Sequence, residues 1–193
     1  MLTIKGTYGQ QLILAIPNNN VRMQYYNYLI EIYSPVCDIN TKELVTMFTR
    51  MAFDGNWHDA LQYMCDCYRQ LSSVRDSIEG ERNIQGFFMA YLSLCNYYII
   101  APELELKHGY CDFFLLPNMT HYQSKHSYIL ELKYLSKSDY SDEKSNAQWN
   151  EAVEQIKGYA IAPRVEALRQ GTQLHKIIIQ FCGWDAVRME EII

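Results

Sequence analysis

The chain has 193 residues, of which 49% are hydrophobic and 20% are charged, which is the composition of one globular domain or of a domain with an appendage. The net charge of −5 argues against a broad nucleic-acid-binding surface, although clustered acids that hold a metal ion would lower the total in the same way. No apolar run has membrane-spanning length and no signal-peptide pattern opens the chain, so we expect a cytoplasmic protein without a membrane partner.

Cysteine and histidine spacing gives no sign of a disulfide framework or a zinc site. Of six cysteines only Cys65 and Cys67 are close together, as C-x-C, which is neither a zinc-ribbon nor a thioredoxin spacing. We therefore expect reduced thiols and no disulfide. The five histidines show no ligand spacing, and His121 and His126 are predicted to lie on the surface of a loop. There is also no glycine-rich phosphate loop.

Residues 1–79 are predicted to be a mostly helical connector or packing region. A short apolar run at 12–16 ends at Pro17, and Asp54-Gly55-Asn56 reads as a turn. The predicted helices cover Val21–Tyr33, Thr41–Ala52 with Thr41 as its possible cap, and Trp57–Val74.

Residues 80–193 show a different pattern and form the expected core of an α/β fold. Helical and strand periods alternate in the order helix, strand, strand, strand, helix, strand. The predicted elements are a helix over 81–97, strands over 98–106, 111–116 and 127–135, a polar loop over 136–145, a helix over 147–162, a strand over 174–182 and a short last strand over 186–192.

Charged residues interrupt two apolar runs of strand length between residues 110 and 135. Asp112 begins the first run, and Glu131 and Lys133 lie within the second. Because side chains two residues apart on a strand share a face, Glu131 and Lys133 point the same way. A run that is apolar on both faces is typical of a central strand, where a charge needs a compensating partner. A metal ion or a catalytic role provides such compensation.

Two further polar residues fall on or beside apolar stripes of predicted helices. Glu81 lies at the centre of the stripe of its helix, so we expect its side chain to point toward the core, with Gln85 one turn later on the same side. Gln155 flanks the stripe of the 147–162 helix, where it could orient a water molecule or contact a phosphate oxygen.

Each of these residues also has an ordinary structural explanation. Asp112 could cap a turn, and Glu131 and Lys133 could form a solvated pair on an edge strand. Glu81 could be an acid that the helix dipole favours at a helix start, and Gln155 could be a boundary polar residue. Together they favour a functional site, because perturbed charges cluster at such sites.

Three strings in this core resemble a known family. They are His-Gly-Tyr-Cys-Asp-Phe-Phe-Leu at 108–115, Tyr-Ile-Leu-Glu-Leu-Lys-Tyr-Leu at 128–135 and Glu-Ala-Val-Glu-Gln-Ile-Lys-Gly-Tyr at 151–159. On the predicted element order, residues 80–193 resemble the PD-(D/E)XK nuclease superfamily. More narrowly, the chain is similar to the C-terminal part of bacterial proteins that join an AAA-ATPase-like domain to such a nuclease-like domain. One difference is Cys111 at the position of the Pro in the superfamily name, a position that carries no chemistry.

This resemblance implies a restriction-endonuclease-like αβββαβ core with a mixed sheet. It implies hydrolysis of phosphodiester bonds in nucleic acid, with DNA as the expected form. Asp112, Glu131 and the backbone carbonyl of Leu132 would hold Mg²⁺, for which Mn²⁺ could substitute. Glu81 would bind the ion through water or bind a second ion.

In the same scheme Lys133 would position or deprotonate the attacking water and stabilise the developing charge, and Gln155 completes the expected catalytic set. The expected partners are nucleic acid and an ATPase-like domain or a second copy of the chain. The rival hypothesis is a non-catalytic interaction module that keeps the nuclease core as a scaffold. The complete Asp/Glu/Lys set favours the enzyme, and the acidic net charge favours the scaffold.

Overall fold

The computed structural model describes residues 39–73, 80–106 and 109–193, together with 3–8, 11–15 and a few separate residues between 21 and 31. The elements in chain order are β1 (Thr3–Tyr8), β2 (Gln11–Ala15), α2 (Thr41–Asp54), α3 (His58–Gln70), the 3₁₀ turn η1 (Leu71–Ser73), α4 (Glu81–Leu92), β3 (Tyr98–Leu106), β4 (Gly109–Pro117), β5 (His126–Leu135), α5 (Asp142–Ala160), α6 (Pro163–Leu168), β6 (Gln173–Cys182) and β7 (Asp185–Glu191).

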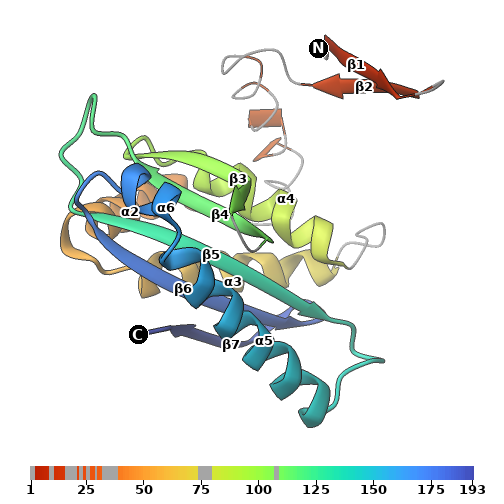
Figure 1. The fold of residues 1–193 in the computed structure, drawn as a ribbon. Helices are drawn as coiled ribbons and strands as arrows, with labels where there is room; N and C mark the ends of the chain where they lie inside the picture. The colour runs from red at the N-terminus through yellow and green to blue at the C-terminus, as the bar shows by residue number, and fades with distance from the viewer. Residues whose placement is uncertain are drawn as a thin grey trace.

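Five of the strands form one mixed sheet in the order β3-β4-β5-β6-β7 (Figure 1). β5 and β6 run parallel, in register from His126 opposite Gln173 to Leu135 opposite Cys182, and the other neighbouring pairs are antiparallel. α5 and α6 lie in the crossover that a parallel pair requires. β5 is therefore the central strand, and the mixed α/β architecture predicted from the sequence is confirmed.

Helices cover both faces of this sheet, with α2, α3 and α4 on one face and α5 and α6 on the other (Figure 1). The alternation along β5 explains why both faces are apolar. Tyr128, Leu130 and Leu132 belong to the core under α2–α4, and Ile129 belongs to the core under α5 and α6. Because α2 and α3 share a core with the sheet, residues 41–70 of the predicted connector pack as part of the same body. The domain boundary near residue 80 stays a prediction.

Side-chain caps set two helix starts, and both differ from the prediction. α2 is capped by Asn40 rather than Thr41, since the Asn40 side chain accepts a hydrogen bond from the amide of Glu43 at 3.2 Å. α5 begins at Asp142, five residues earlier than expected, because Ser141 caps it and accepts from the amide of Lys144 at 3.2 Å. The polar loop after β5 is correspondingly short.

Helix ends also depart from the apolar pattern. α4 stops at Leu92 although the stripe continues to the buried Cys95, because the chain turns and the Ser93 hydroxyl donates to the carbonyl of Ala90 at 2.6 Å. α2 ends at Gly55, whose φ of 74° is the left-handed conformation that favours glycine, and this confirms the predicted turn. The short helix α6 was not predicted.

The first residues form an antiparallel hairpin, β1–β2, where the sequence suggested only an apolar run before helices. The predicted helix over Val21–Tyr33 lies mostly outside the described residues. In the part of the chain that is described, no helix is long and apolar enough to cross a membrane. Five cysteines there carry free thiols, and Cys37 lies outside it.

Candidate active site

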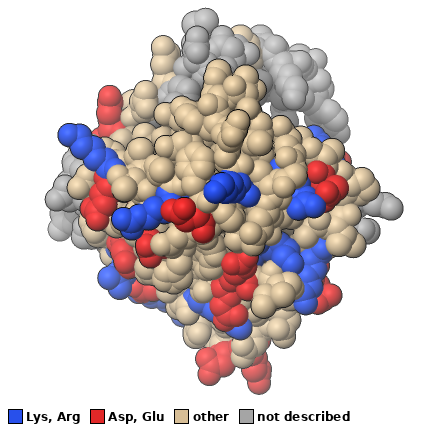
Figure 2. Space-filling view, turned by 90° about the vertical axis from the view of Figure 1, so that its left-hand side faces the viewer, with Lys and Arg blue, Asp and Glu red and all other residues tan. Residues whose placement is uncertain are grey.

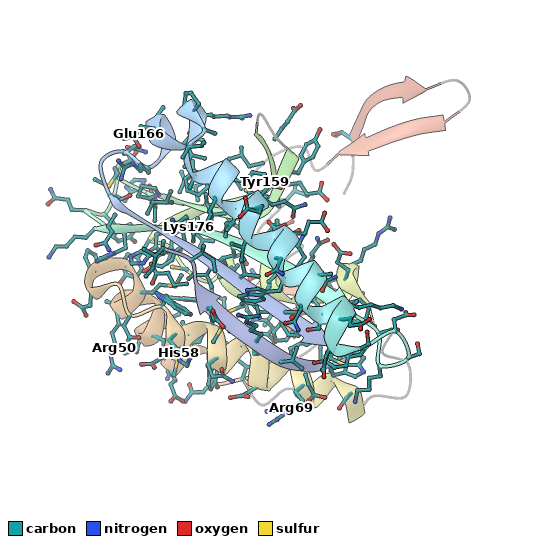
Figure 3. All side chains as sticks on the ribbon, turned by 60° about the horizontal axis from the view of Figure 1, so that its bottom comes forward. Arg50, His58, Arg69, Tyr159, Glu166 and Lys176 are labelled. Carbon is teal, nitrogen blue, oxygen red and sulfur yellow. The ribbon has the colours of Figure 1, made fainter. Side chains whose placement is uncertain are left out.

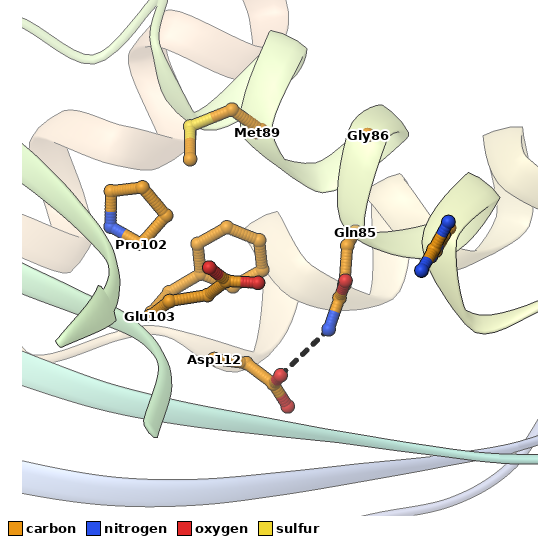
Figure 4. Close-up of a pocket in the computed structure, with 8 residues that line it drawn as sticks. Gln85, Gly86, Met89, Pro102, Glu103 and Asp112 are labelled. Atoms are coloured by element: carbon orange, nitrogen blue, oxygen red, sulfur yellow. Dashed lines mark hydrogen bonds between the residues drawn. The ribbon is translucent and has the colours of Figure 1, made fainter. Parts of the chain in front are cut away.

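Asp112 lies where β4 loses its regular pairing. β4 and β5 are in register from Leu115 opposite Tyr128 to Phe113 opposite Leu130. Beyond this pair the backbone hydrogen bonds between β4 and β5 give way to a side-chain bond, in which Oδ2 of Asp112 accepts from the backbone N–H of Leu132 at 2.7 Å. Oδ1 accepts from Nε2 of Gln85 on α4 at 2.8 Å (Figure 4). Asp112 therefore ties β4 to both β5 and α4 and is not a turn cap.

The faces of β4 confirm this irregularity. Cys111 and Phe113 are two residues apart and should share a face. Cys111 instead packs in the core under α5, whereas Phe113 packs in the core under α2–α4. The strand turns over at Asp112, which directs this carboxylate to the edge of the β4–β5 ladder.

Glu131 and Lys133 lie on the central strand and share a face, so the solvated edge-strand alternative is wrong. Glu131 is only 3% exposed, and its Oε1 accepts from Nζ of Lys133 at 2.8 Å. Nζ also donates to Oε1 of Gln155 on α5 at 3.0 Å. Gln155 in turn donates to Glu151 one turn earlier, at 3.2 Å. The structure thus brings Gln155 to Lys133.

The buried carboxylate of Glu131 and the half-buried carboxylate of Asp112 lie near one another, and each alters the pKa of neighbouring groups. Desolvation and the charge of Asp112 raise the pKa of Glu131 to about 7, against the lowering effect of Lys133. Burial also raises the pKa of Asp112, opposed by the hydrogen bond from Leu132, by Lys133 and by Gln85. Oε2 of Glu131 is buried and has no hydrogen-bond partner. This pair has an excess of negative charge that one lysine does not neutralise.

The same excess charge reaches neighbouring groups. Burial, followed by the charges of Glu131 and Asp112, raises the pKa of Cys111 to about 12. Burial and Glu131 also raise the pKa of Tyr159 on α5 to about 12. The Tyr159 hydroxyl donates to the carbonyl of Tyr110 at 3.0 Å and so holds α5 against β4 (Figure 3). Sequence reasoning placed Tyr159 on the same helix edge as Gln155 but gave it no part in the site.

Glu81 does not point toward the core, and that expectation is wrong. It is the first residue of α4, where the helix dipole favours an acid, and its side chain is exposed. Its charge still raises the pKa of Asp112. Glu81 therefore borders the site from the solvent side, and Gln85, one turn later, is the α4 side chain that contacts Asp112.

A pocket of about 420 Å³ opens beside Asp112, between α4 and β3–β4 (Figure 4). Neither Glu131 nor Lys133 lines it. One lining residue, Glu103, was not singled out from the sequence. The lining residues are Arg82, Gln85, Gly86, Met89, Pro102, Glu103, Asp112 and Phe113.

The residues present fit a hard divalent cation with oxygen ligands. The buried Oε2 of Glu131 has no partner, and Asp112 supplies a second, half-buried carboxylate nearby. Among the described residues no three His, Cys, Asp or Glu side chains gather closely enough to hold a metal ion. Two carboxylates and a carbonyl suit an ion such as Mg²⁺ that keeps several waters, and they do not suit a closed structural site.

A second polar group lies around the start of β5, where His126 is half-buried in the strand and does not lie in a loop as predicted. Nδ1 of His126 lies 2.9 Å from Nε2 of His175, whose Nδ1 lies 2.7 Å from Oε1 of Glu191. The indole N–H of Trp57 donates to Oε2 of the same glutamate at 2.9 Å. His175 also stacks on Tyr128, with ring centroids 4.8 Å apart. We refer to the histidine cluster as the set His126, His175, Glu191 and Trp57.

The charged surface is mixed on the face shown in Figure 2, where basic and acidic side chains alternate over the described residues. This agrees with the net charge of −5. Any attraction for an anionic polymer must come from local groups rather than from a broad basic face.

Comparison with protein families finds that the model of the PD-(D/E)XK nuclease superfamily matches residues 79–191. The match spans the described elements from α4 to β7, including Asp112, Glu131, Lys133 and Gln155. Comparisons with curated proteins and with solved structures gave no match.

Proposed function

Because the chain belongs to the PD-(D/E)XK nuclease superfamily, we propose that it hydrolyses phosphodiester bonds in nucleic acid, with Asp112, Glu131 and Lys133 at the reacting centre. One observation carries this proposal. Glu131, a carboxylate 3% exposed on the central strand, keeps one oxygen without a partner near the half-buried carboxylate of Asp112. A purely structural acid would be fully hydrogen-bonded, since an unpaired buried oxygen costs stability.

The proposed cofactor is Mg²⁺, with Mn²⁺ as a substitute. Asp112, Glu131 and the carbonyl of Leu132 would hold it, and exposed Glu81 would contribute through water. When bound, such an ion polarises a phosphoryl oxygen and lowers the pKa of a coordinated water. Ionised Glu131 is the form that binds a cation, so binding would displace the proton that its raised pKa favours.

In this proposal Lys133 stabilises the negative charge that develops at the phosphate. Its ammonium has three N–H donors, and Glu131 and Gln155 accept two of them. The third is left for a phosphate oxygen or for the attacking water, where a fixed positive charge stabilises the transition state. Gln155 is a positioning residue in this scheme, because it fixes the Lys133 ammonium from α5.

The substrate form we propose is DNA. An ATPase-like domain or a second copy of the chain as partner, and a cytoplasmic location, stay predictions. Two observations favour the rival scaffold function: the net charge of −5, and the absence of a third carboxylate beside the pair among the described residues. Activity decides between the two.

The test compares wild type with Asp112→Asn, Lys133→Ala and the control Lys137→Ala, an exposed lysine just after β5. Plasmid, linear duplex, single-stranded DNA and RNA are each incubated with Mg²⁺ or Mn²⁺ at low salt, because an acidic protein binds phosphates weakly. We expect Lys133→Ala to bind the ion as wild type does in calorimetry and to cut at least about 10²-fold more slowly.

Asp112→Asn should lose both metal binding and cutting, and Lys137→Ala should retain both. Equal cutting by wild type, Asp112→Asn and Lys133→Ala would identify a contaminant and reject the enzyme. No cutting of any substrate, together with no metal binding by wild type, would favour the scaffold.

A further inference from the structure

The pocket beside Asp112 has the construction of a site for a flat, partly polar ring. Met89, Pro102 and Phe113 supply apolar walls, and Gly86 on α4 leaves room because it has no side chain. Gln85 and Glu103 extend into it from α4 and β3, as Figure 4 shows. Its volume of about 420 Å³ lies in the range of pockets that hold small organic groups.

Glu103 is held in an unusual conformation at this pocket. Its φ is 47°, in the left-handed region that non-glycine residues adopt at a cost of about 1 kcal/mol or more. β3 and β4 pair up to Pro102 opposite Phe113 and resume at Leu104 opposite Cys111, so Glu103 and Asp112 stand at the same level where the ladder is interrupted. Glu103 is exposed, and in the described part of the chain its carboxylate forms no hydrogen bond or ion pair, so it is accessible to a ligand that enters the pocket. Conformations of this kind cluster at functional sites.

Two roles are open to an acid in this place. The first is an extra metal ligand, but Glu103 does not form a three-ligand group with Asp112 and Glu131 among the described residues. The second is a hydrogen-bond acceptor for a ring that rests on the apolar walls. Arg82, the cation among the lining residues, can meet a phosphate next to such a ring.

We propose, resting on the proposed nuclease function, that this pocket holds one unpaired base next to the bond that is cut, and that Glu103 selects bases with an amino donor. A carboxylate only accepts hydrogen bonds, so it favours the amino groups of cytosine, adenine and guanine. Thymine and uracil present carbonyl oxygens on both sides of their single N–H, which repel it. A base read in a pocket must be unpaired, so the substrate is a single strand or an opened end.

The first experiment maps cleavage of a single-stranded DNA pool of random sequence by wild type with Mg²⁺. We expect thymine to be depleted about 10-fold or more at one fixed position beside the cut, the discrimination that a good base contact gives. Glu103→Gln adds an N–H donor and should flatten this preference. Glu105→Gln is the matched control, since Glu105 is an exposed acid on the same strand that does not line the pocket, and it should keep the wild-type pattern.

The second experiment does not depend on cutting. Lys133→Ala is titrated with fluorescent oligo(dC), oligo(dA) and oligo(dT) in the presence of Ca²⁺. Oligo(dT) should bind about 10-fold more weakly than the other two, and the double variant Lys133→Ala/Glu103→Gln should lose the difference.

The outcomes separate the two proposals. Cutting without base preference, or a preference that survives Glu103→Gln, overturns the role of Glu103 and leaves the nuclease standing. Base-selective binding without cutting under any condition rejects the nuclease function and supports the pocket. Equal binding of all three oligonucleotides rejects the pocket whatever the cutting assay shows.

Discussion

Two polar groups include residues of the central strand β5, and they differ at their most buried side chain. In the histidine cluster both ring nitrogens of His175 have a partner, and Glu191 uses both oxygens, one toward His175 and one toward Trp57. In the acid pair, Asp112 and Glu131, Oε2 of Glu131 has no partner. The hydrogen bonds of His175 are therefore satisfied within the protein, and those of Glu131 would be completed by a cation.

This difference teaches how to separate structural from functional polar residues. Each group contains one buried ionisable side chain, Glu131 or His175, so burial alone does not distinguish them. The histidine cluster links β5, β6 and β7 to the start of α3 through Trp57. In the acid pair Asp112 accepts from Gln85 on α4 and Glu131 accepts from Lys133, but Glu131 retains an unused acceptor oxygen.

The largest expected effect comes from Glu131→Gln. Removing this charge should abolish Mg²⁺ binding in calorimetry and slow cutting by about 10³-fold or more, because cation binding and charge stabilisation are lost together. The Gln side chain can still accept from Lys133, so the circular dichroism spectrum should match that of wild type. Wild-type metal affinity in this variant would show that Glu131 is as structural as Glu191.

The second effect is the pH dependence of stability without metal. The pKa of Glu131 is raised from 4.5 to about 7, so the folded state holds a proton that the unfolded state has released. The contribution of Glu131 to the free energy of unfolding is therefore fully present below about pH 4.5. It falls as pH rises toward 7, by up to about 3 kcal/mol. Urea unfolding at several pH values should show this slope. Saturating Mg²⁺ should remove it, and a slope that persists with Mg²⁺ would contradict the site.

The third effect is on stability alone. His175→Ala should lower the free energy of unfolding by about 1–3 kcal/mol, because it removes the partner of Oε1 of Glu191 and of Nδ1 of His126 and removes the stack on Tyr128. The melting temperature should fall by about 2–4 °C for each kcal/mol lost. His121→Ala, an exposed histidine on the turn before β5, is the control and should change little. Cutting per folded molecule should stay unchanged, and a loss there would join the two groups functionally.

The smallest effect is the contribution of His126 to stability, which depends on pH in the opposite direction to that of Glu131. Burial and the neighbouring His175 lower the pKa of His126 from 6.5. A histidine with a depressed folded pKa contributes stability above its unfolded pKa and loses it as pH falls. His126→Gln should make unfolding less sensitive to pH between about 7 and 5 than in wild type. The effect should be smaller than that of Glu131, since His126 is partly exposed.

The sequence predicted those parts of the site that depend on local periodicity. Strand parity was sufficient to put Glu131 and Lys133 on one face, and helix phase was sufficient to relate Gln85 to the core side of α4. The expected orientation of Glu81 was wrong because the first turn of a helix projects past the layer that its stripe covers.

Features that depend on strand register were beyond the sequence. His126 and His175 are 49 residues apart, and only the parallel register that sets Tyr128 opposite His175 brings them together. The conformation of Glu103 follows from an interruption between β3 and β4, which no residue pattern in either strand announces. The cap at Ser141 was within reach of the sequence, since a serine followed by two acids is a helix-start pattern.

The parallel pairing of β5 and β6 has a consequence for folding during synthesis on the ribosome. All the proposed site residues, from Glu81 to Gln155, leave the ribosome before β6, which begins at residue 173. Without β6 the central strand lacks one neighbour along all ten of its paired positions. Pairing β5 with β6 brings together strands that are far apart in the sequence, and such long-range pairing is slow and comes late in folding. We therefore expect a nascent chain not to act on the nucleic acid around it until β6, residues 173–182, has left the ribosome.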